Sequence, residues 1–283
     1  MTRPTEPSAP TWLPHPLVGG EFASPVEPGS GWPDDPAAAD TPVARDARDV
    51  RRLADGVALD ELGARVSVCA ACPRLVTWRE DVAVGKRASF ADQPYWGRPI
   101  PGWGAADPSL LIVGLAPAAN GGNRTGRIFT GDPSADWLFA SLHRTGWAVQ
   151  PTSEHAGDGQ QLVDARMVAT VRCAPPENKP TADERDTCAP WIAAELALLP
   201  TVRAVVALGS FGWDGALRSL AAAGATVPTR RPKFGHGVEV GLGDVTLIGC
   251  YHPSPHNTYT RRLTAEMTDA VFERARALTD LPA

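Results

Sequence analysis

Four short apolar runs, separated by segments of helical pattern, limit the folds open to this 283-residue chain. Each run reads as a strand that is buried on both faces; the runs cover residues 110–114, 167–171, 204–208 and 245–250. Helical patterns cover residues 135–145, 182–199, 211–223 and 260–278. This alternation predicts a parallel sheet with helices on both of its faces. With 43% hydrophobic residues, the chain can bury one sizeable core.

The first 64 residues differ from the rest in composition and charge. They contain five arginines and eleven acidic residues, a net charge of −6, whereas the remainder has a net charge of +1. Up to about residue 41 the segment is rich in Pro, Ala, Gly and Asp, a composition typical of disorder. Residues 45–62 have a helical pattern. We therefore expect an acidic extension at 1–64, partly disordered or loosely docked, followed by a globular domain at 65–283.

Composition also excludes some classes of protein. No apolar stretch approaches the roughly 18 residues that span a bilayer, and the N-terminus lacks the apolar region of a secretory signal. We expect a cytoplasmic monomer with no membrane partner, and no feature of the sequence points to an obligate protein partner. In that compartment, five cysteines favour metal binding or chemistry over a disulfide framework.

The loop after the first apolar run is the expected place for a ligand. It reads GLAPAANGGNRTGRIFTGD over residues 114–132 and consists almost entirely of small and polar residues. In an open parallel sheet, ligands bind beyond the carboxyl ends of the strands. The loop matches neither G-x-G-x-x-G nor a P-loop, but it offers accessible backbone, an aromatic face at Phe129 and a carboxylate at Asp132. Ser134 is the expected N-cap of the next helix, and helix capping is the alternative role for Asp132.

Four cysteines have the spacing of ligands. Cys69 and Cys72 form C-x2-C, Cys173 follows a predicted strand, and Cys188 lies on the next predicted helix. Four thiolates suit either tetrahedral zinc or an iron–sulfur cluster, and the spacing leaves both open, together with four unliganded thiols. Cys250 continues an apolar run and is expected in the core.

A stiff loop follows the last predicted strand. Residues 251–257 read YHPSPHN, with prolines on both sides of Ser254. The loop belongs to the same carboxyl edge of the sheet as the loop that ends at Asp132. His252 would therefore face that carboxylate, which favours a functional role for this histidine.

Taken together, four segments resemble the family 5 uracil-DNA glycosylases of the uracil-DNA glycosylase superfamily. The segments are CAACPRLVTWRE, GLAPAANGGNRTGRIFTGD, RCAPPENKPTADERDTC and HPSPHNTYTRRLT, and the resemblance covers about residues 66–278. It implies a three-layer α/β/α sandwich with a four-stranded, mainly parallel central sheet. It also implies a monofunctional DNA-repair glycosylase that hydrolyses the N-glycosidic bond of uracil and other deaminated bases in DNA. The family's cofactor is a [4Fe-4S] cluster, whose ligands here would be Cys69, Cys72, Cys173 and Cys188.

The resemblance also implies roles for single residues. Asp132 matches the family's water-activating residue, Asn178 matches a second catalytic polar residue, and His252 would face the carbonyls of the base. The remaining base-binding positions would be Gly114, Leu115, Ala116, Phe129 and Ala169. The loop after His252 resembles the superfamily's minor-groove loop, and DNA contacts are expected from Ser254, Asn257, Arg124 and Arg262.

Three positions depart from relatives. Leu115 stands where better-known superfamily members place a polar residue that activates water, so this work would move to Asp132. Ala169 stands where family 4 enzymes place an Asn that hydrogen-bonds uracil. Without that amide, a different base leaves no polar side chain at this position without a hydrogen-bond partner. We therefore expect excision of hypoxanthine as well as uracil. Asn120 replaces the His of some relatives.

Two other function classes are compatible with parts of the sequence. An iron–sulfur redox protein would also need four spaced cysteines, but the chain has no second cofactor motif. A DNA-binding module without catalysis would not need Asp132 and His252 at facing loop ends. We therefore favour the glycosylase.

Overall fold

A six-stranded sheet forms the centre of the molecule in the computed structural model, which describes residues 11–279. The strand order is β3-β5-β4-β6-β8-β7. The four inner strands run parallel to one another: β4 (Leu110–Gly114), β5 (Ala165–Ala169), β6 (Ala204–Leu208) and β8 (Val245–Cys250). Short antiparallel strands, β3 (Trp103–Gly104) and β7 (Glu239–Leu242), form the two edges. The predicted four-stranded parallel core is therefore confirmed, and two edge strands extend it.

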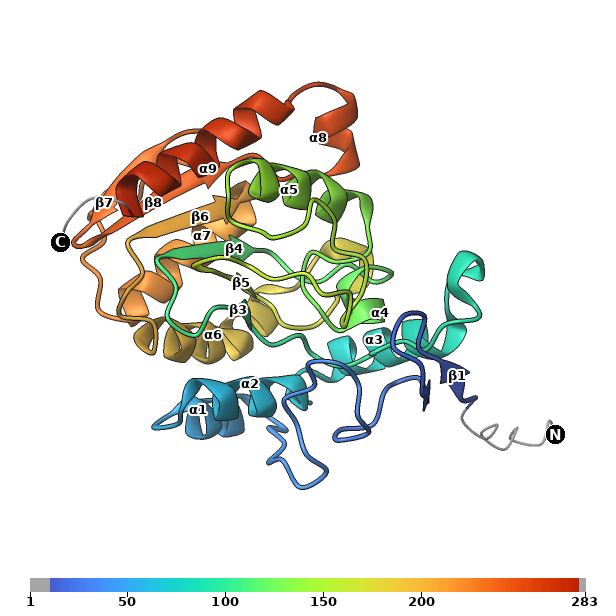
Figure 1. Cartoon of the computed structure of the whole chain (residues 1–283). Helices are drawn as coiled ribbons and strands as arrows, with labels where there is room; N and C mark the ends of the chain where they lie inside the picture. Colours follow the sequence, from blue (N-terminus) through green and yellow to red (C-terminus); the bar gives the residue numbers. More distant parts are fainter. Residues whose placement is uncertain (1–10, 280–283) are drawn as a thin grey trace.

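Helices cover both faces of this sheet (Figure 1). The faces separate on β4, where Leu110 and Ile112 belong to one apolar cluster while Leu111 and Val113 belong to another, as the two-residue period of a strand requires. On the first face lie α5 (Pro133–Arg144) and α9 (Ala265–Thr279); on the second lie α6 (Ala182–Ala197) and α7 (Gly209–Ala222). This is the predicted three-layer sandwich.

Shorter elements connect these layers. They are α3 (Pro73–Gly85), the 3-10 turn η1 (Ala88–Phe90), α4 (Gly122–Thr125), the 3-10 turn η2 (Pro176–Asn178) and α8 (Pro255–Tyr259). The predicted helix 260–278 is wrong at its start. Its first five residues form the turn that separates α8 from α9. No helix within residues 11–279 has both the length and the apolar character needed to cross a membrane.

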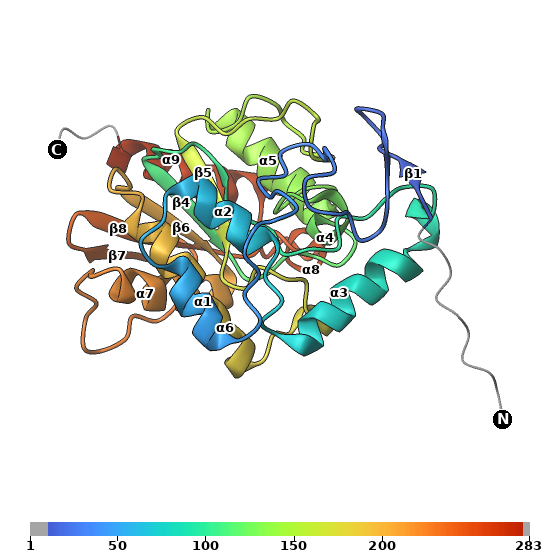
Figure 2. The same cartoon turned by 90° about the horizontal axis from the view of Figure 1, so that it is seen from below.

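The N-terminal segment is part of the folded domain from residue 11 onward. It forms β1 (Leu13–Pro14), β2 (Glu21–Phe22), α1 (Ala47–Ala54) and α2 (Leu59–Ser67), and both helices lie against α6 (Figure 2). Phe22, Val26 and Trp32 are buried in the same apolar cluster as β4. Asp35 forms a buried ion pair of 2.7 Å with Arg98. These contacts differ from the loose docking expected from composition, because scattered apolar side chains anchor a segment that is otherwise polar. Residues 1–10 lie outside the described part.

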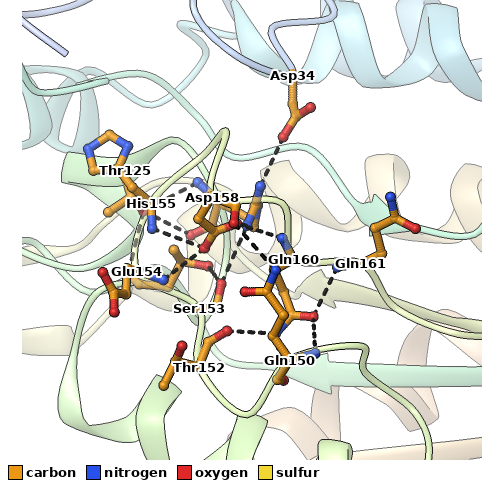
Figure 3. A network of polar contacts seen from close by, with 12 residues as sticks. Asp34, Thr125, Gln150, Thr152, Ser153, Glu154, His155, Asp158, Gln160 and Gln161 are labelled. Atoms are coloured by element: carbon orange, nitrogen blue, oxygen red, sulfur yellow. Dashed lines mark hydrogen bonds and ion pairs between the residues drawn. The ribbon is translucent and has the colours of Figure 1, made fainter. Parts of the chain in front are cut away.

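A polar network ties this segment to the loop before α5 (Figure 3). The guanidinium of Arg127 pairs with Asp158 at 2.6 Å and with Asp34, from the N-terminal segment, at 3.0 Å. Next to it, the Ser153 hydroxyl lies 2.8 Å from that of Thr130, and the Ser153 carbonyl accepts a hydrogen bond from the Gly131 amide. These contacts therefore fix the backbone that leads into α5.

Candidate active site

A cavity of about 560 Å³ lies at the carboxyl edge of the parallel strands, where the sequence predicts a site. Segments from five parts of the chain form its wall: the loops after β4, β5, β6 and β8 meet there, and the segment before β7 adds Phe234. Nine of the predicted site residues line it: Leu115, Ala116, Phe129, Asp132, Asn178, His252, Ser254, Asn257 and Arg262.

Asp132 caps helix α5 and also faces the cavity. Its Oδ1 accepts hydrogen bonds from the amides of Ser134 and Ala135 at 2.9 and 3.1 Å. Ser134 is therefore not the N-cap; Pro133 occupies the first helical position, as is common for proline, and the cap is Asp132, two residues earlier than predicted. Burial raises the pKa of Asp132, and the two amides act in the opposite direction. The cap uses Oδ1, so Oδ2 is free of this role.

Phe129 forms an aromatic wall of the cavity. Its backbone has a φ of 49°, in the left-handed region that costs a bulky residue energy. The ring lies over Gly114, where a Cβ would stand 2.7 Å from Cε2 and Cζ. Gly114 and Ala169 do not line the cavity themselves; they are paired in register at the ends of β4 and β5 beneath it.

His252 stands across from this ring, with centroids 6.1 Å apart. Its carbonyl accepts hydrogen bonds from the Nδ2 of Asn257 and the amide of Ser254, both at 2.8 Å, and the Ser254 hydroxyl caps α8. No residue in the described range 11–279 is hydrogen-bonded to the imidazole. Burial lowers the pKa of His252 to about 4, so the ring is neutral near pH 7 and carries one N–H that is available to a ligand.

Asn178 lies on η2, at the mouth of the cavity. The side chain is exposed, and both Asn178 and Glu177 have positive φ values, of 56° and 53°. Two consecutive residues in this region mark a sharply turned loop, which directs Asn178 to the same cavity as Asp132.

Arg124 is buried in this fold, whereas the sequence prediction of a DNA contact requires an exposed side chain. It lies on α4 with 5% of its surface exposed, and the guanidinium donates to the carbonyls of Asn120 and Gly131. The Asn120 side chain accepts a hydrogen bond from the Tyr95 hydroxyl, on the side away from the cavity lining. A lone arginine in a polar loop gives no indication from sequence of whether it is buried.

Several aromatic residues near the site were missed. Phe211 lies in the first turn of α7 and is half exposed, while Phe234 and Tyr251 complete the cavity wall. Tyr259, at the end of α8, has 81% of its surface exposed. The position of Tyr251 directly before His252 was a usable signal; Phe234 lies in a segment without periodic pattern and offered none.

Comparisons with known proteins agree with this geometry. A family model for the uracil DNA glycosylase superfamily matches residues 101–276. A protein of Mycobacterium tuberculosis named type-5 uracil-DNA glycosylase is 57% identical over 270 residues, 94% of this chain and 99% of its own length. Proteins of the same name from Thermus thermophilus and Pyrobaculum aerophilum are 46% and 44% identical over 76% and 77% of this chain and 96% and 92% of theirs. The chain belongs to the type-5 uracil-DNA glycosylases.

In this type-5 glycosylase, the four spaced cysteines line a second, small cavity between α3, α6 and the end of β5. Cys69 and Cys72 are partly exposed, and Cys173 and Cys188 are buried. Cys250 is buried in the main apolar cluster, away from this cavity. Within residues 11–279, no three Cys, His, Asp or Glu side chains are grouped as one metal ion would require.

Buried nitrogen donors surround the cysteine cavity. Arg79 is 4% exposed and donates to the Cys173 sulfur and the Cys69 carbonyl, both at 3.0 Å. The Arg79 Nε and the indole N–H of Trp191 are buried without an acceptor in the described part of the chain. Unsatisfied donors in a buried site are costly, so the lining suits an anionic group with sulfur acceptors.

Proposed function

We propose that this chain excises uracil from DNA by hydrolysing the N-glycosidic bond, which leaves an abasic site. One observation supports this most: a single cavity joins Asp132, Asn178 and His252, from three distant segments, in a member of a family whose relatives are named type-5 uracil-DNA glycosylase. The target nucleotide would leave the duplex to enter this cavity, at a cost of a few kcal/mol of unstacking.

Inside the cavity, Phe129 would stack on the base and His252 would meet its polar edge. Negative charge gathers on the base carbonyls as the bond from N to C1′ breaks. A neutral imidazole N–H at His252 stabilises that charge without reorganisation, and the backbone amides around Leu115 and Ala116 add to this effect. Because Leu115 is apolar, its side chain cannot activate water.

Asp132 would act on the opposite side of the sugar. The ionised carboxylate orients a water and takes its proton while the water oxygen bonds to C1′, and the electron pair of the broken bond leaves with the base. The same negative charge offsets the oxocarbenium character of the sugar. Asn178, at the cavity mouth, would hold this water or the sugar by hydrogen bonds.

The surface around α8 would meet the DNA. Tyr259 is exposed there, and Arg261 and Arg262 follow after one residue, with the Arg262 guanidinium 4.9 Å from the centre of the Tyr251 ring. Positive side chains position a protein on the phosphates, and an exposed aromatic ring can stack against a base step. Ser254 and Asn257 would act mainly by shaping this loop.

We propose that the cysteine cavity holds a [4Fe-4S] cluster rather than a zinc ion. The four thiols surround the cavity without three of them converging as one ion requires, and a cluster binds each thiolate at a separate iron. Arg79 and Trp191 would donate to its sulfurs. The cluster would supply no step of the reaction; it would crosslink α3 and α6 to the sheet.

We further propose that the enzyme accepts hypoxanthine. A base in this cavity would meet mainly an aromatic ring, backbone groups and His252, all of which a purine can use. Ala169, at the position of the uracil-reading Asn of family 4, presents no amide.

A strand-cleavage assay tests the main proposal. The full-length protein is incubated in excess with a labelled duplex that contains one uracil, and abasic sites are then cleaved with alkali. We expect cleavage at the uracil position only after alkali. Cleavage without alkali would contradict a monofunctional glycosylase, and DNA binding without cleavage would favour a module without catalysis.

A further inference from the structure

Arg124 is a buried cation that forms no ion pair with a carboxylate within the described residues 11–279. Its guanidinium donates to the Asn120 carbonyl from Nε at 3.0 Å, to Gln93 Oε1 from Nη1 at 2.9 Å and to the Gly131 carbonyl from Nη2 at 2.9 Å. Its carbon lies 4.0 Å above the ring of Phe90. Hydrogen bonds to neutral acceptors alone offset only a small part of the free energy that it costs to bury a charge. Stability therefore does not account for the burial of this cation, which points to a functional role.

Asp132 is the carboxylic acid whose charge acts on this cation. Arg124 bonds to the carbonyl of Gly131, the residue that precedes Asp132, so the guanidinium lies on the backbone that positions the carboxylate. The approach is close enough that a Cβ at position 131 would overlap Nη2, and the φ of Gly131 is 74°. Glycine at 131 is thus favoured by its backbone conformation and by the close approach of the Glu154 carbonyl and the Arg124 guanidinium.

Opposing influences act on the Asp132 carboxyl. Burial and the nearby Asp136 of α5 raise its pKa, while the two capping amides and the charge of Arg124 lower it. Across the cavity stand His252, whose ring is neutral, and Arg262. A general base has to be ionised to take a proton, so the contribution of Arg124 has the sign that catalysis requires.

We propose that Arg124 is a positioning residue for Asp132: it fixes the Gly131 carbonyl and uses its buried charge to keep the carboxylate ionised. This inference rests on the proposed role of Asp132 in activating water. Arg124 would thus have a function that Arg127, a second buried arginine three residues later in the chain, does not share.

The test is the pH dependence of single-turnover excision from a uracil duplex. In Arg124→Gln, the acid limb of the rate profile should move up by about 1 pH unit, because removal of a nearby positive charge makes the carboxyl harder to ionise. Arg124→Lys retains the charge and loses the fork of donors. The acid limb of the Arg124→Lys rate profile should stay near that of the parent protein, and the rate on the plateau should be lower. A uniform loss of rate at every pH in Arg124→Gln would overturn the proposal.

Arg127→Gln is the matched control. Arg127 is equally buried but pairs with Asp34 and Asp158, so its loss should lower stability and leave the acid limb in place. A shift of equal size in Arg127→Gln would attribute the effect to general loosening and contradict a specific role for Arg124.

A direct readout separates this inference from the proposed function. Carboxyl carbon NMR of labelled aspartate, with the Asp132 signal assigned from Asp132→Asn, measures ionisation without catalysis. The Asp132 signal should titrate about 1 pH unit higher in Arg124→Gln than in the parent. If Asp132→Asn remained active, the role of Asp132 in catalysis would fail while this titration still tested Arg124. An unchanged titration would refute the electrostatic role. If Arg124→Gln does not fold, Arg124→Met and Arg124→Lys provide the same neutral and charged comparison.

Discussion

The ring of Phe129 lies against the Cα of Gly114, with no room between them for a methyl group. The stacking face of the cavity therefore depends on a glycine at the end of β4. Glycine is needed there for a close approach, since a Cβ would meet the ring at 2.7 Å.

Gly114→Ala should displace the Phe129 ring and weaken the hold on the base. We expect a loss of about 5- to 100-fold in single-turnover efficiency, the range associated with one base–aromatic stack. Phe129→Ala should give a similar loss, and the double variant should lose no more than either single one, because both act on one contact. Additive losses would show that Gly114 acts independently of Phe129.

Asp132→Asn should slow the chemical step by about 10²- to 10⁴-fold, the usual contribution of a positioned acid or base. The asparagine oxygen can still cap α5, so folding and DNA affinity should change little. Single-turnover rates and a thermal melt measure the two effects. Near-normal cleavage would move water activation to Asn178.

The cysteine cavity predicts iron in the purified protein. Cys69→Ala and Cys173→Ala should lose iron, visible absorption and stability, because a cluster would link α3 to the sheet. Cys250→Ala is the matched control: it removes another buried thiol, outside the cavity, and should keep the full iron content. Stoichiometric zinc and no iron after anaerobic purification would contradict the cluster.

Substrate breadth follows from the apolar lining near Ala169. The parent enzyme should excise hypoxanthine as well as uracil from matched duplexes, and Ala169→Asn should narrow this range toward uracil. Ala169 is buried beside Phe129 below the cavity, so the new amide has to reach the base or remain unpaired at a cost of about 1–3 kcal/mol. Strict uracil specificity in the parent would show that another residue selects the base.

Acid should destabilise the attachment of the N-terminal segment. The ring of His155 lies 4.4 Å from that of His15, centroid to centroid, and burial followed by the His15 charge lowers the pKa of His155 from 6.5 to about 3. Between these values the unfolded chain binds a proton that the folded protein does not, so stability is lost as pH falls through this window.

His155→Gln should flatten that loss of stability, measured as the denaturation midpoint against pH. His256→Gln, which changes an exposed histidine, is the control and should retain the steep dependence. An equal flattening in both variants would mean that other groups dominate the acid sensitivity.

The inner strands were predictable because each is buried on both faces and therefore apolar throughout. The edge strands were not: β7 reads EVGL and is half solvated, and β3 is only two residues long. The predicted helix 45–62 is interrupted at Gly56, with a φ of 68°, and forms α1 and α2 instead. A helical period in sequence does not reveal such a turn.

In the site, the predictable residues were those that follow strands, because topology alone gathers strand ends at one edge. Asp132 and His252 were found in this way, whereas Asn178 was predicted only from the family resemblance. The burial of Arg124 was not predictable, since it depends on Gln93 and Phe90, which approach from a distant segment.

The N-terminal segment has a practical consequence for anyone who shortens this protein. Its composition suggests a dispensable leader, and the boundary near residue 64 is an obvious place to cut. Trp32 lies 6.2 Å from Trp96, ring to ring, and Asp35 neutralises the buried Arg98 that stacks on that same indole at 3.8 Å. A protein trimmed to start at Val66 would therefore expose an unpaired cation and bare indole surface to water, and should aggregate where the intact chain remains dispersed.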